Sequence, residues 1–285
     1  MSQKLSRYSF SGHESFQCKS LWLKKGYDYM TDGHSFNDID AVAKLGVGKN
    51  MVTSIRFWLR AFGLTKSDEL QPISLYIFDS VKGVDPYTED LNTLWLLHFL
   101  LVSSEVASLY NLLFIDYQRE KKEFRKTDLQ SFIKRKCSVP EQRNVYNENT
   151  VRKDIGVLLK NYVAPSDLKT IEDFSALLIT LGSIVSKGHD AYSFKTHEKK
   201  DIAQEIVLFA LIRMKGEDRT ASFDILQKLS LIFGLPMTIL IEIIRDLETT
   251  FPDTLVFTDN SGIKNVQFIR EINEFDALNH YYQSL

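Results

Sequence analysis

Hydrophobic residues recur at helical spacing along much of the chain, most clearly between residues 49 and 62. The apolar stripe of that segment runs from Val52 to Phe62, and the opposite side carries lysine, threonine and arginine. A shorter helical pattern occupies residues 38–45, and Gly46 to Gly48 break the chain between the two. A short helix, a glycine turn and a helix with one apolar and one basic face are typical of a helix-turn-helix, so we expect the second helix to be a recognition helix.

Two later stretches repeat this order of helix, turn, helix and β-hairpin. Apolar residues three and four apart predict the helices, and β-prone runs around turn-forming residues predict the hairpins. The predicted segments are helices at 127–137 and 150–162 with a hairpin within 177–194, then helices at 202–214, 223–231 and 237–247 with a hairpin at 255–269.

The predicted fold class is mainly α with small β-hairpins, an α+β fold of tandem winged helix-turn-helix modules joined by a buried helical region. Residues 91–117 are hydrophobic nearly all round, which is typical of helices buried between modules. Residues 65–90 predict a short strand pair that would form a wing, with 74–78 as its β-prone stretch. The expected domains are an N-terminal helix-turn-helix module with its wing at 1–90, a helical linker with a second winged helix at 91–195, and a C-terminal winged-helix-like module at 196–285.

The charge balance excludes a chain that is basic throughout. The formal net charge is −2 and the isoelectric point is near 6.3, so contacts with phosphate must come from local basic faces. Residues 119–136 hold eight Lys or Arg against three Asp or Glu, whereas residues 241–285 hold three against eight. This drift fits a protein that meets a polyanion at one end and proteins at the other, and it also fits an unevenly charged globule. The longest apolar run, 94–102, is far shorter than the roughly 20 residues of a membrane span, so we expect a cytoplasmic protein without membrane contact.

The basic helix faces supply the candidate DNA contacts. Lysine and arginine hold phosphates, and short polar side chains reach base edges. The candidates are Lys49, Asn50, Thr53, Arg56, Arg60, Arg125, Lys126, Lys134, Arg135, Arg152 and Lys153. A solvated helix surface without a partner is the competing interpretation, because exposed Lys and Arg need no function. The helix at 237–247 sets one arginine against Glu242 and Asp246, so we expect that module to bind proteins or to dimerise.

A second candidate patch consists of Ser11, His13, Glu14 and Ser15, in an irregular, aromatic-rich N-terminal stretch. The patch lacks the second histidine of a zinc-protease helix and the glycines that flank a serine nucleophile. Capping of a helix at 16–25 explains these polar residues best, while a buried functional site stays open.

No nucleotide, metal or cofactor site is expected. Residues 46–49 resemble the end of a phosphate-binding loop, but Ala43 stands where its first glycine belongs and Asn50 replaces the Ser or Thr that would hold magnesium. The two cysteines, Cys18 and Cys137, lie far apart, which excludes a cysteine-rich zinc module.

Several stretches of the N-terminal half together form a specific pattern. They are residues 9–16 (SFSGHESF), 21–28 (LWLKKGYD), 45–52 (LGVGKNMV), 54–58 (SIRFW), 61–64 (AFGL), 85–87 (DPY), 89–90 (ED) and 93–98 (TLWLLH). This half of the chain resembles a prokaryotic family known as domain of unknown function 4007. The resemblance implies a bacterial or archaeal protein of mobile defence islands, encoded near proteins of DNA sulfur modification or of phage exclusion. It implies no established activity and no catalytic residue.

These observations favour a non-enzymatic DNA-binding adaptor of an anti-phage defence or DNA-modification system. Double-stranded DNA and the proteins of that complex would be its partners. A transcriptional regulator of its own operon, a protein-only scaffold, and a cryptic enzyme that uses His13 and Glu14 remain as alternatives. Self-association into a homodimer also stays open.

Overall fold

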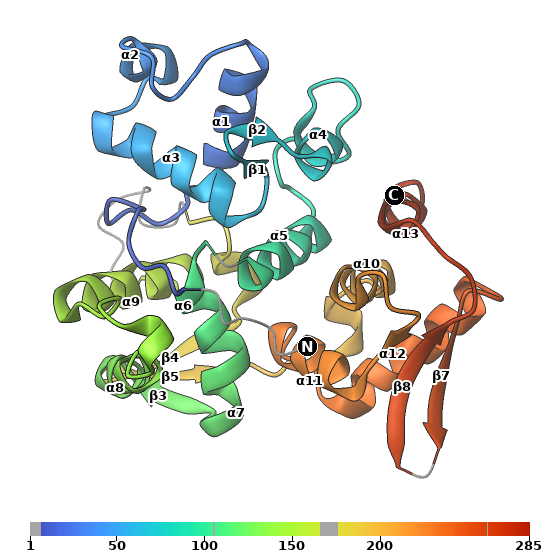
Figure 1. Cartoon of the computed structure of the whole chain (residues 1–285). Helices are drawn as coiled ribbons and strands as arrows, with labels where there is room; N and C mark the ends of the chain where they lie inside the picture. Colours follow the sequence, from blue (N-terminus) through green and yellow to red (C-terminus); the bar gives the residue numbers. More distant parts are fainter. Residues whose placement is uncertain (1–6, 105, 166–175, 261) are drawn as a thin grey trace. The chain divides into compact units, whose positions relative to one another are not determined.

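The computed structural model describes residues 7–104, 106–165, 176–260 and 262–285 (Figure 1). Contacts within the chain divide it into two compact units, residues 1–194 and residues 195–285. Both units combine helices with small antiparallel sheets, so the predicted α+β class is confirmed. The expected boundary at residue 90 lies inside the first unit, and the division into three modules stays a prediction.

The first unit begins with three helices, a two-stranded sheet and a fourth helix. These elements are α1 (Trp22–Thr31), α2 (Ala41–Leu45), α3 (Lys49–Ala61), β1 (Thr65–Lys66), β2 (Glu69–Leu70) and α4 (Pro72–Phe78). The helices α1 and α3 pack closely because Gly26 in the middle of α1 has no side chain. A Cβ atom at Gly26 would lie 2.7 Å from a methyl group of Leu59 and 2.8 Å from one of Ile55.

Two predicted segments of this region were wrong. The stretch 74–78 is not a strand but part of α4, whose first residue is Pro72. Proline suits the first turn of a helix, and Ile73, Ile77 and Phe78 are buried at helical spacing, so packing overrides the β propensity. The first helix spans Trp22–Thr31 instead of 16–25. The stretch before Trp22 is held by contacts with distant residues, because the N–H of Cys18 donates to Asn161 and Lys19 forms a β-bridge with Ala176.

The rest of the first unit is built around the apolar helix α5 (Leu91–Ser103), in which every residue from Thr93 to Val102 is buried. The side chain of Asp90 caps its first turn by accepting from the N–H groups of Asn92 and Thr93. The elements that follow are α6 (Ser108–Asn111), a π-helical turn at Leu112–Tyr117, α7 (Gln118–Glu120), β3 (Glu123–Arg125), α8 (Lys126–Lys136), α9 (Glu148–Tyr162), β4 (Ile184–Gly188) and β5 (Ala191–Phe194).

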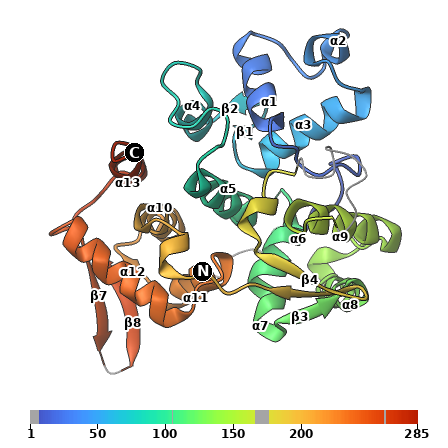
Figure 2. The ribbon, with the colours of Figure 1, turned by 180° about the vertical axis from the view of Figure 1, so that it is seen from behind.

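The strands β3, β4 and β5 form one antiparallel sheet in the order β3-β5-β4. The register pairs Phe124 with Tyr192 and Ile184 with Phe194. Both views place α8 and α9 beside each other near this sheet (Figure 2). The predicted helices at 127–137 and 150–162 and the predicted hairpin are therefore confirmed.

The second unit repeats this order of elements. It contains α10 (Gln204–Lys215), β6 (Thr220–Ala221), α11 (Phe223–Ile232), α12 (Met237–Thr250), β7 (Leu255–Asn260), β8 (Ile263–Phe268) and α13 (Glu274–Tyr282). Its sheet has the order β6-β8-β7, so the first strand pairs with the third in both sheets. The predicted helices and hairpin of this part are confirmed within a few residues.

Among the described residues, no single helix combines the length and the hydropathy that a membrane span needs. Two sharply bent helix pairs, residues 91–120 and 223–250, meet both criteria by length and composition alone.

The close approach of α1 and α3 predicts the effect of Gly26→Ala. The added methyl group would overlap Leu59 and Ile55, so we expect the free energy of unfolding to fall by about 1–3 kcal/mol. The matched control is Gly156→Ala in the middle of α9, where nothing lies within 4 Å of the added carbon. That variant should gain about 0.5–1 kcal/mol, because alanine favours a helix over glycine. Urea unfolding measures both, and equal stability of the two variants would contradict the packing argument.

The second unit should lose stability in mild acid through His197. Its ring is 3% exposed, and burial lowers its pKa below the ordinary value of 6.5. The unfolded chain therefore takes up a proton at a higher pH than the folded chain, and stability falls as the pH drops below 6.5. In His197→Gln this part of the pH dependence should vanish. Urea unfolding between about pH 5 and 8 compares the two proteins, and parallel curves would show that His197 is not the cause.

Candidate functional site

The turn between α2 and α3 sets the direction of the first basic face. Gly46 ends α2 with φ +62°, a conformation that favours glycine, and its N–H donates to the carbonyl of Ala43. Tyr29, Ala41, Leu45 and Val52 form a small buried cluster beneath this turn. The helix α3 therefore turns its other side outward, and the exposed candidates on it are Lys49, Asn50, Thr53 and Arg60.

Arg56, also on α3, is held by neighbouring groups of the same unit. Its Nε atom donates to Oδ1 of Asp68 at 3.0 Å, Nη2 contacts the other carboxylate oxygen, and Nη1 donates to Oδ1 of Asn37 at 3.0 Å. The hydrogen bond from Arg56 holds the pKa of Asp68 below its usual value of 3.8. Arg56 thus ties α3 to the turn between β1 and β2, and a phosphate would have to compete with Asp68 for it.

Half of the α8 candidates are similarly engaged. The Nζ atom of Lys126 lies 2.8 Å from the Asp190 carboxylate, and Arg135 binds both carboxylate oxygens of Glu120. Arg125, the last residue of β3, and Lys134 are exposed, and no carboxylate of the described part of the chain lies within 4.0 Å of their charged side-chain atoms. The carboxylate of Asp128 accepts from the backbone N–H of Arg125 at 3.1 Å. Only part of the sequence-predicted basic set on α8 is therefore available to an external anion.

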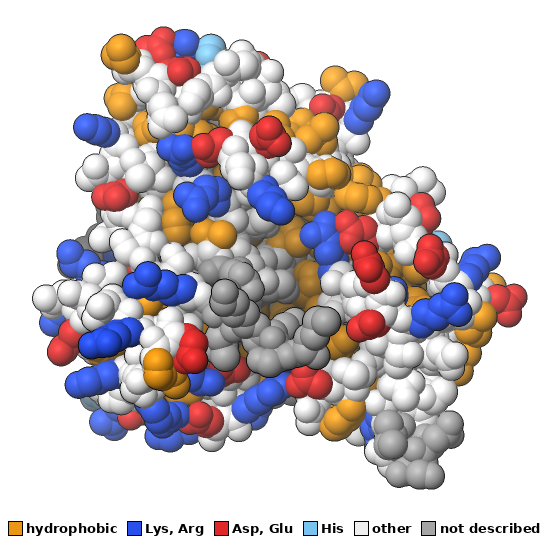
Figure 3. All heavy atoms as spheres, in the orientation of Figure 1, with side chains coloured by type: hydrophobic (Ala, Val, Ile, Leu, Met, Phe, Trp, Pro, Cys, Tyr) orange, Lys and Arg blue, Asp and Glu red, His pale blue; other side chains and the backbone are white. Residues whose placement is uncertain are grey.

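The helix α9 has two different sides. Val151, Ile155 and Leu158 pack into the core, whereas Arg152, Lys153 and Lys160 are exposed. Nη2 of Arg152 donates to the side-chain oxygen of Asn149 at 3.1 Å. Within the four described ranges, no carboxylate lies within 4.0 Å of the three basic side chains. Figure 3 shows lysine and arginine side chains spread over the part of the first unit that carries α8 and α9.

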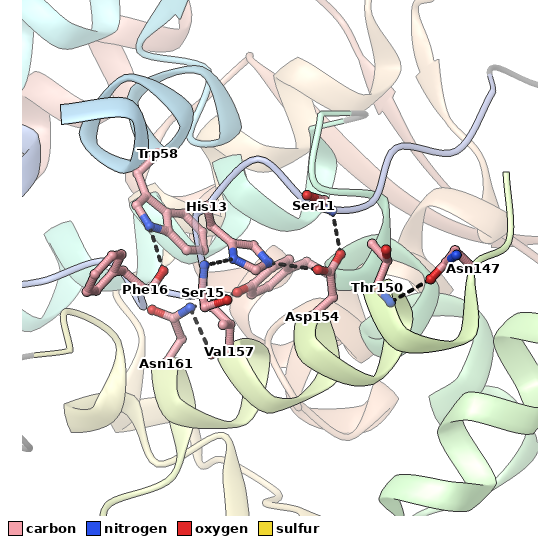
Figure 4. A network of polar contacts seen from close by, with 11 residues as sticks. Ser11, His13, Ser15, Phe16, Trp58, Asn147, Thr150, Asp154, Val157 and Asn161 are labelled. Carbon is pink, nitrogen blue, oxygen red and sulfur yellow. Dashed lines mark hydrogen bonds and ion pairs between the residues drawn. The ribbon is translucent and has the colours of Figure 1, made fainter. Parts of the chain in front are cut away.

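The N-terminal patch lies apart from these basic faces and is partly buried. His13 is 6% exposed, and its Nε2 atom lies 2.9 Å from Oδ1 of Asp154 on α9 (Figure 4). The backbone N–H of Ser11 donates to Oδ2 of the same carboxylate at 2.7 Å. The N–H of Ser15 donates to Nδ1 of His13 at 3.1 Å. Because Nδ1 accepts, the ring proton is on Nε2 and points to Asp154.

The chain reaches this geometry through an unusual backbone. Gly12 has φ +105°, and a Cβ atom there would lie 2.6 Å from the ring of Phe57. The His13 ring stacks on Trp58 with ring centroids 6.1 Å apart, and Nε1 of Trp58 donates to the carbonyl of Phe16. The exposed Glu14 makes no part of this network.

Two further contacts continue the attachment toward α1. The N–H of Cys18 donates to the side-chain oxygen of Asn161 at 3.0 Å, and Asn161 donates to the hydroxyl of Tyr110 at 2.7 Å. Sequence reasoning does not single out Asp154 or Asn161, because they occupy buried positions between the basic residues of a helix. One sequence signal could have identified Asp154: it is a carboxylate at a position of the helical pattern that faces the core. A buried carboxylate needs a hydrogen-bond partner, so such a position indicates a specific contact.

Both nitrogens of His13 and both oxygens of Asp154 are used to hold the N-terminal segment. The geometry joins the sequence-predicted Ser11, His13 and Ser15 to α9 and α3, as an anchor of that segment. No group of three or more His, Cys, Asp or Glu side chains that could hold a metal ion occurs among the described residues.

Comparisons with known proteins give a family and a fold. A family model described as "Protein of unknown function (DUF4007)" matches residues 10–282, nearly the whole chain. A crystal structure of SspB superimposes with a TM-score of 0.84, and a crystal structure of magnesium-bound SspB with a TM-score of 0.80. Each is 24% identical and aligns over 96% of this chain and 88% of the other. No curated protein matches the sequence. The likeness to SspB at this identity shows a shared fold.

Asp154→Ala should release the N-terminal segment from α9. It removes the acceptor of both the His13 ring and the Ser11 N–H, and the orphaned donor of the buried His13 ring costs about 1–3 kcal/mol. We expect a lower free energy of unfolding in urea and faster limited proteolysis within residues 7–18. Glu14→Ala, in the same segment but exposed, is the control and should change neither measurement. Unchanged proteolysis of Asp154→Ala would mean that the remaining contacts, the packing on Trp58 and the hydrogen bond from Cys18 to Asn161 among them, are enough to hold the segment.

Proposed function

The chain belongs to the DUF4007 family of proteins of unknown function, and we propose that it is a non-enzymatic DNA-binding adaptor of a prokaryotic defence or DNA-modification system. The system would be of the phosphorothioation or phage-exclusion type that the family resemblance implies. In this proposal the first unit holds duplex DNA through its basic helix faces, and the second unit binds partner proteins.

The observation that carries the proposal is a repeated topology next to basic helix faces. In β3–β5 with α8 and α9, and again in β6–β8 with α11 and α12, a strand, two helices and a hairpin form a sheet in which the first strand pairs with the third. This arrangement supports tandem winged-helix modules, and such modules place their second helix against DNA. The helix in that position of the first unit is α9, which carries exposed Arg152, Lys153 and Lys160.

The second unit presents a different surface in the equivalent position. On α12 the exposed residues include Glu242 and Arg245, and Asp246 forms an ion pair with Lys199. Residues 241–285 hold eight Asp or Glu against three Lys or Arg. Such a surface repels phosphate, which supports a protein partner for the second unit.

The proposal predicts binding to duplexes of any sequence with a strong dependence on salt. Each phosphate that a lysine or arginine neutralises releases counterions, so the logarithm of the affinity should fall linearly with the logarithm of the salt concentration. Fluorescence anisotropy with random and own-promoter duplexes measures this. A preference for the promoter of about 4 kcal/mol or more would instead make the protein a regulator of its own operon. Absence of binding at low salt would leave the protein-only scaffold.

The double variant Arg152→Ala/Lys153→Ala tests the face of α9. It should weaken binding to all duplexes alike and reduce the salt slope by about 2. Lys264→Ala/Arg270→Ala removes the same charge from the second unit and serves as the control. If both double variants lower the affinity equally, net charge rather than the α9 face determines binding.

A further inference from the structure

A half-buried glycine, Gly156, lies in the centre of the basic side of α9. At about 100° per residue, Asn149, Arg152, Lys153, Gly156 and Lys160 fall within an arc of roughly 100° on the helix surface. Three of the five carry a positive charge and none is acidic. The buried Asp154 and Asn161 lie on another side of the helix, where they hold the N-terminal segment (Figure 4).

No contact within the described part of the chain explains Gly156. Glycine in the middle of a helix is destabilising relative to alanine, and helices retain it where another group comes too close for a side chain. Such a neighbour exists at Gly26, where a Cβ atom would lie 2.7 Å from Leu59. At Gly156 a Cβ atom would meet no atom of another described segment within 4 Å. The bare backbone of α9 is therefore open to the outside at the midpoint of the basic stripe.

We propose that Gly156 is the point where the sugar-phosphate backbone of duplex DNA comes closest to the protein, with Arg152, Lys153 and Lys160 as the flanking phosphate contacts. This inference rests on the proposed DNA-binding function and adds its geometry. The charge of the stripe selects a polyanion, because the three cations point outward without a carboxylate among the described residues within 4.0 Å. Because Gly156 has no side chain, a ligand can approach the backbone of α9 closely. The sugar-phosphate backbone of DNA runs along a helix in this way when the helix lies in the groove.

The same surface makes α9, rather than α3, the helix that enters the groove. On α3 the centre of the basic face is occupied by Arg56, which is bound to Asp68 and Asn37. On α9 the centre is a glycine with open space in front of it.

Two substitutions at Gly156 separate close approach from simple charge attraction. Gly156→Ala adds one methyl group and should raise the melting temperature by about 2 °C, because alanine favours the helix. The same variant should weaken DNA binding by about three- to tenfold, as expected for the loss of a close backbone contact. Gly156→Lys adds a positive charge, yet it should also weaken binding because its side chain fills the contact.

The matched controls are Thr249→Ala and Thr249→Lys, at an exposed position of α12 in the second unit. Anisotropy on one random duplex across a salt series gives the affinities, and thermal unfolding gives the stabilities. The inference is overturned if Gly156→Ala binds like the wild type, or if Gly156→Lys binds more tightly. In either case wild-type binding would still support the adaptor. Absence of wild-type binding at low salt would overturn the proposed function and this inference together.

Discussion

The contact between His13 and Asp154 determines how the first unit is assembled. Asp154 is buried on α9, and a buried carboxylate without partners would cost several kcal/mol. The ring of His13 and the N–H of Ser11 satisfy its two oxygens, and Trp58 on α3 supports the ring. One short segment without regular structure thereby joins two helices that lie about a hundred residues apart in the chain. The positive φ angles at Ser11, Gly12, Glu14 and Ser15 bend the backbone into the loop that makes both contacts.

As a result, the buried side and the exposed side of α9 have different roles. Its buried side holds the core and the N-terminal segment, and its exposed side offers cations. A helix whose buried side is held by the core and by the N-terminal segment resists rotation and shift, so the exposed residues keep a constant spacing. Constant spacing matters for a helix that meets a regular polyanion, because phosphate contacts fix the register of a protein on its duplex. In the proposed DNA-binding role of α9, the anchor at His13 would contribute through the rigidity of the helix and without touching the DNA.

The sequence predicted the helices that have a clear apolar stripe and the hairpin that has typical turn residues. The apolar stripes of α8, α9, α11 and α12 and the turn residues between β4 and β5 predict these elements within a few residues. The failures have a common cause in contacts between distant residues. Packing of Ile73 and Ile77 turned a β-prone stretch into α4, and the contacts of Cys18 with Asn161 and of Lys19 with Ala176 keep the chain out of a helix until Trp22. Of the candidate patch, the sequence contained Ser11, His13 and Ser15, but their acceptor lies 141 residues beyond His13. The ion pair between Arg56 and Asp68 was hidden for the same reason, since it depends on how the turn after β1 folds back onto α3.

Gly26 and Gly156 are both glycines inside helices, but they differ in whether another part of the chain packs against them. Each stands inside a helix, where it costs about 0.5–1 kcal/mol relative to alanine, a noticeable part of a net stability of about 5–15 kcal/mol. At Gly26 the structure supplies the compensation, because α3 packs against the bare backbone and two methyl groups fill the space of the side chain. At Gly156 the described part of the chain supplies none, although the surrounding cations form an otherwise regular face. An unfavourable glycine without a compensating contact in the described chain supports the proposal that another molecule approaches α9 there, and the positive charges of Arg152, Lys153 and Lys160 favour an anionic one.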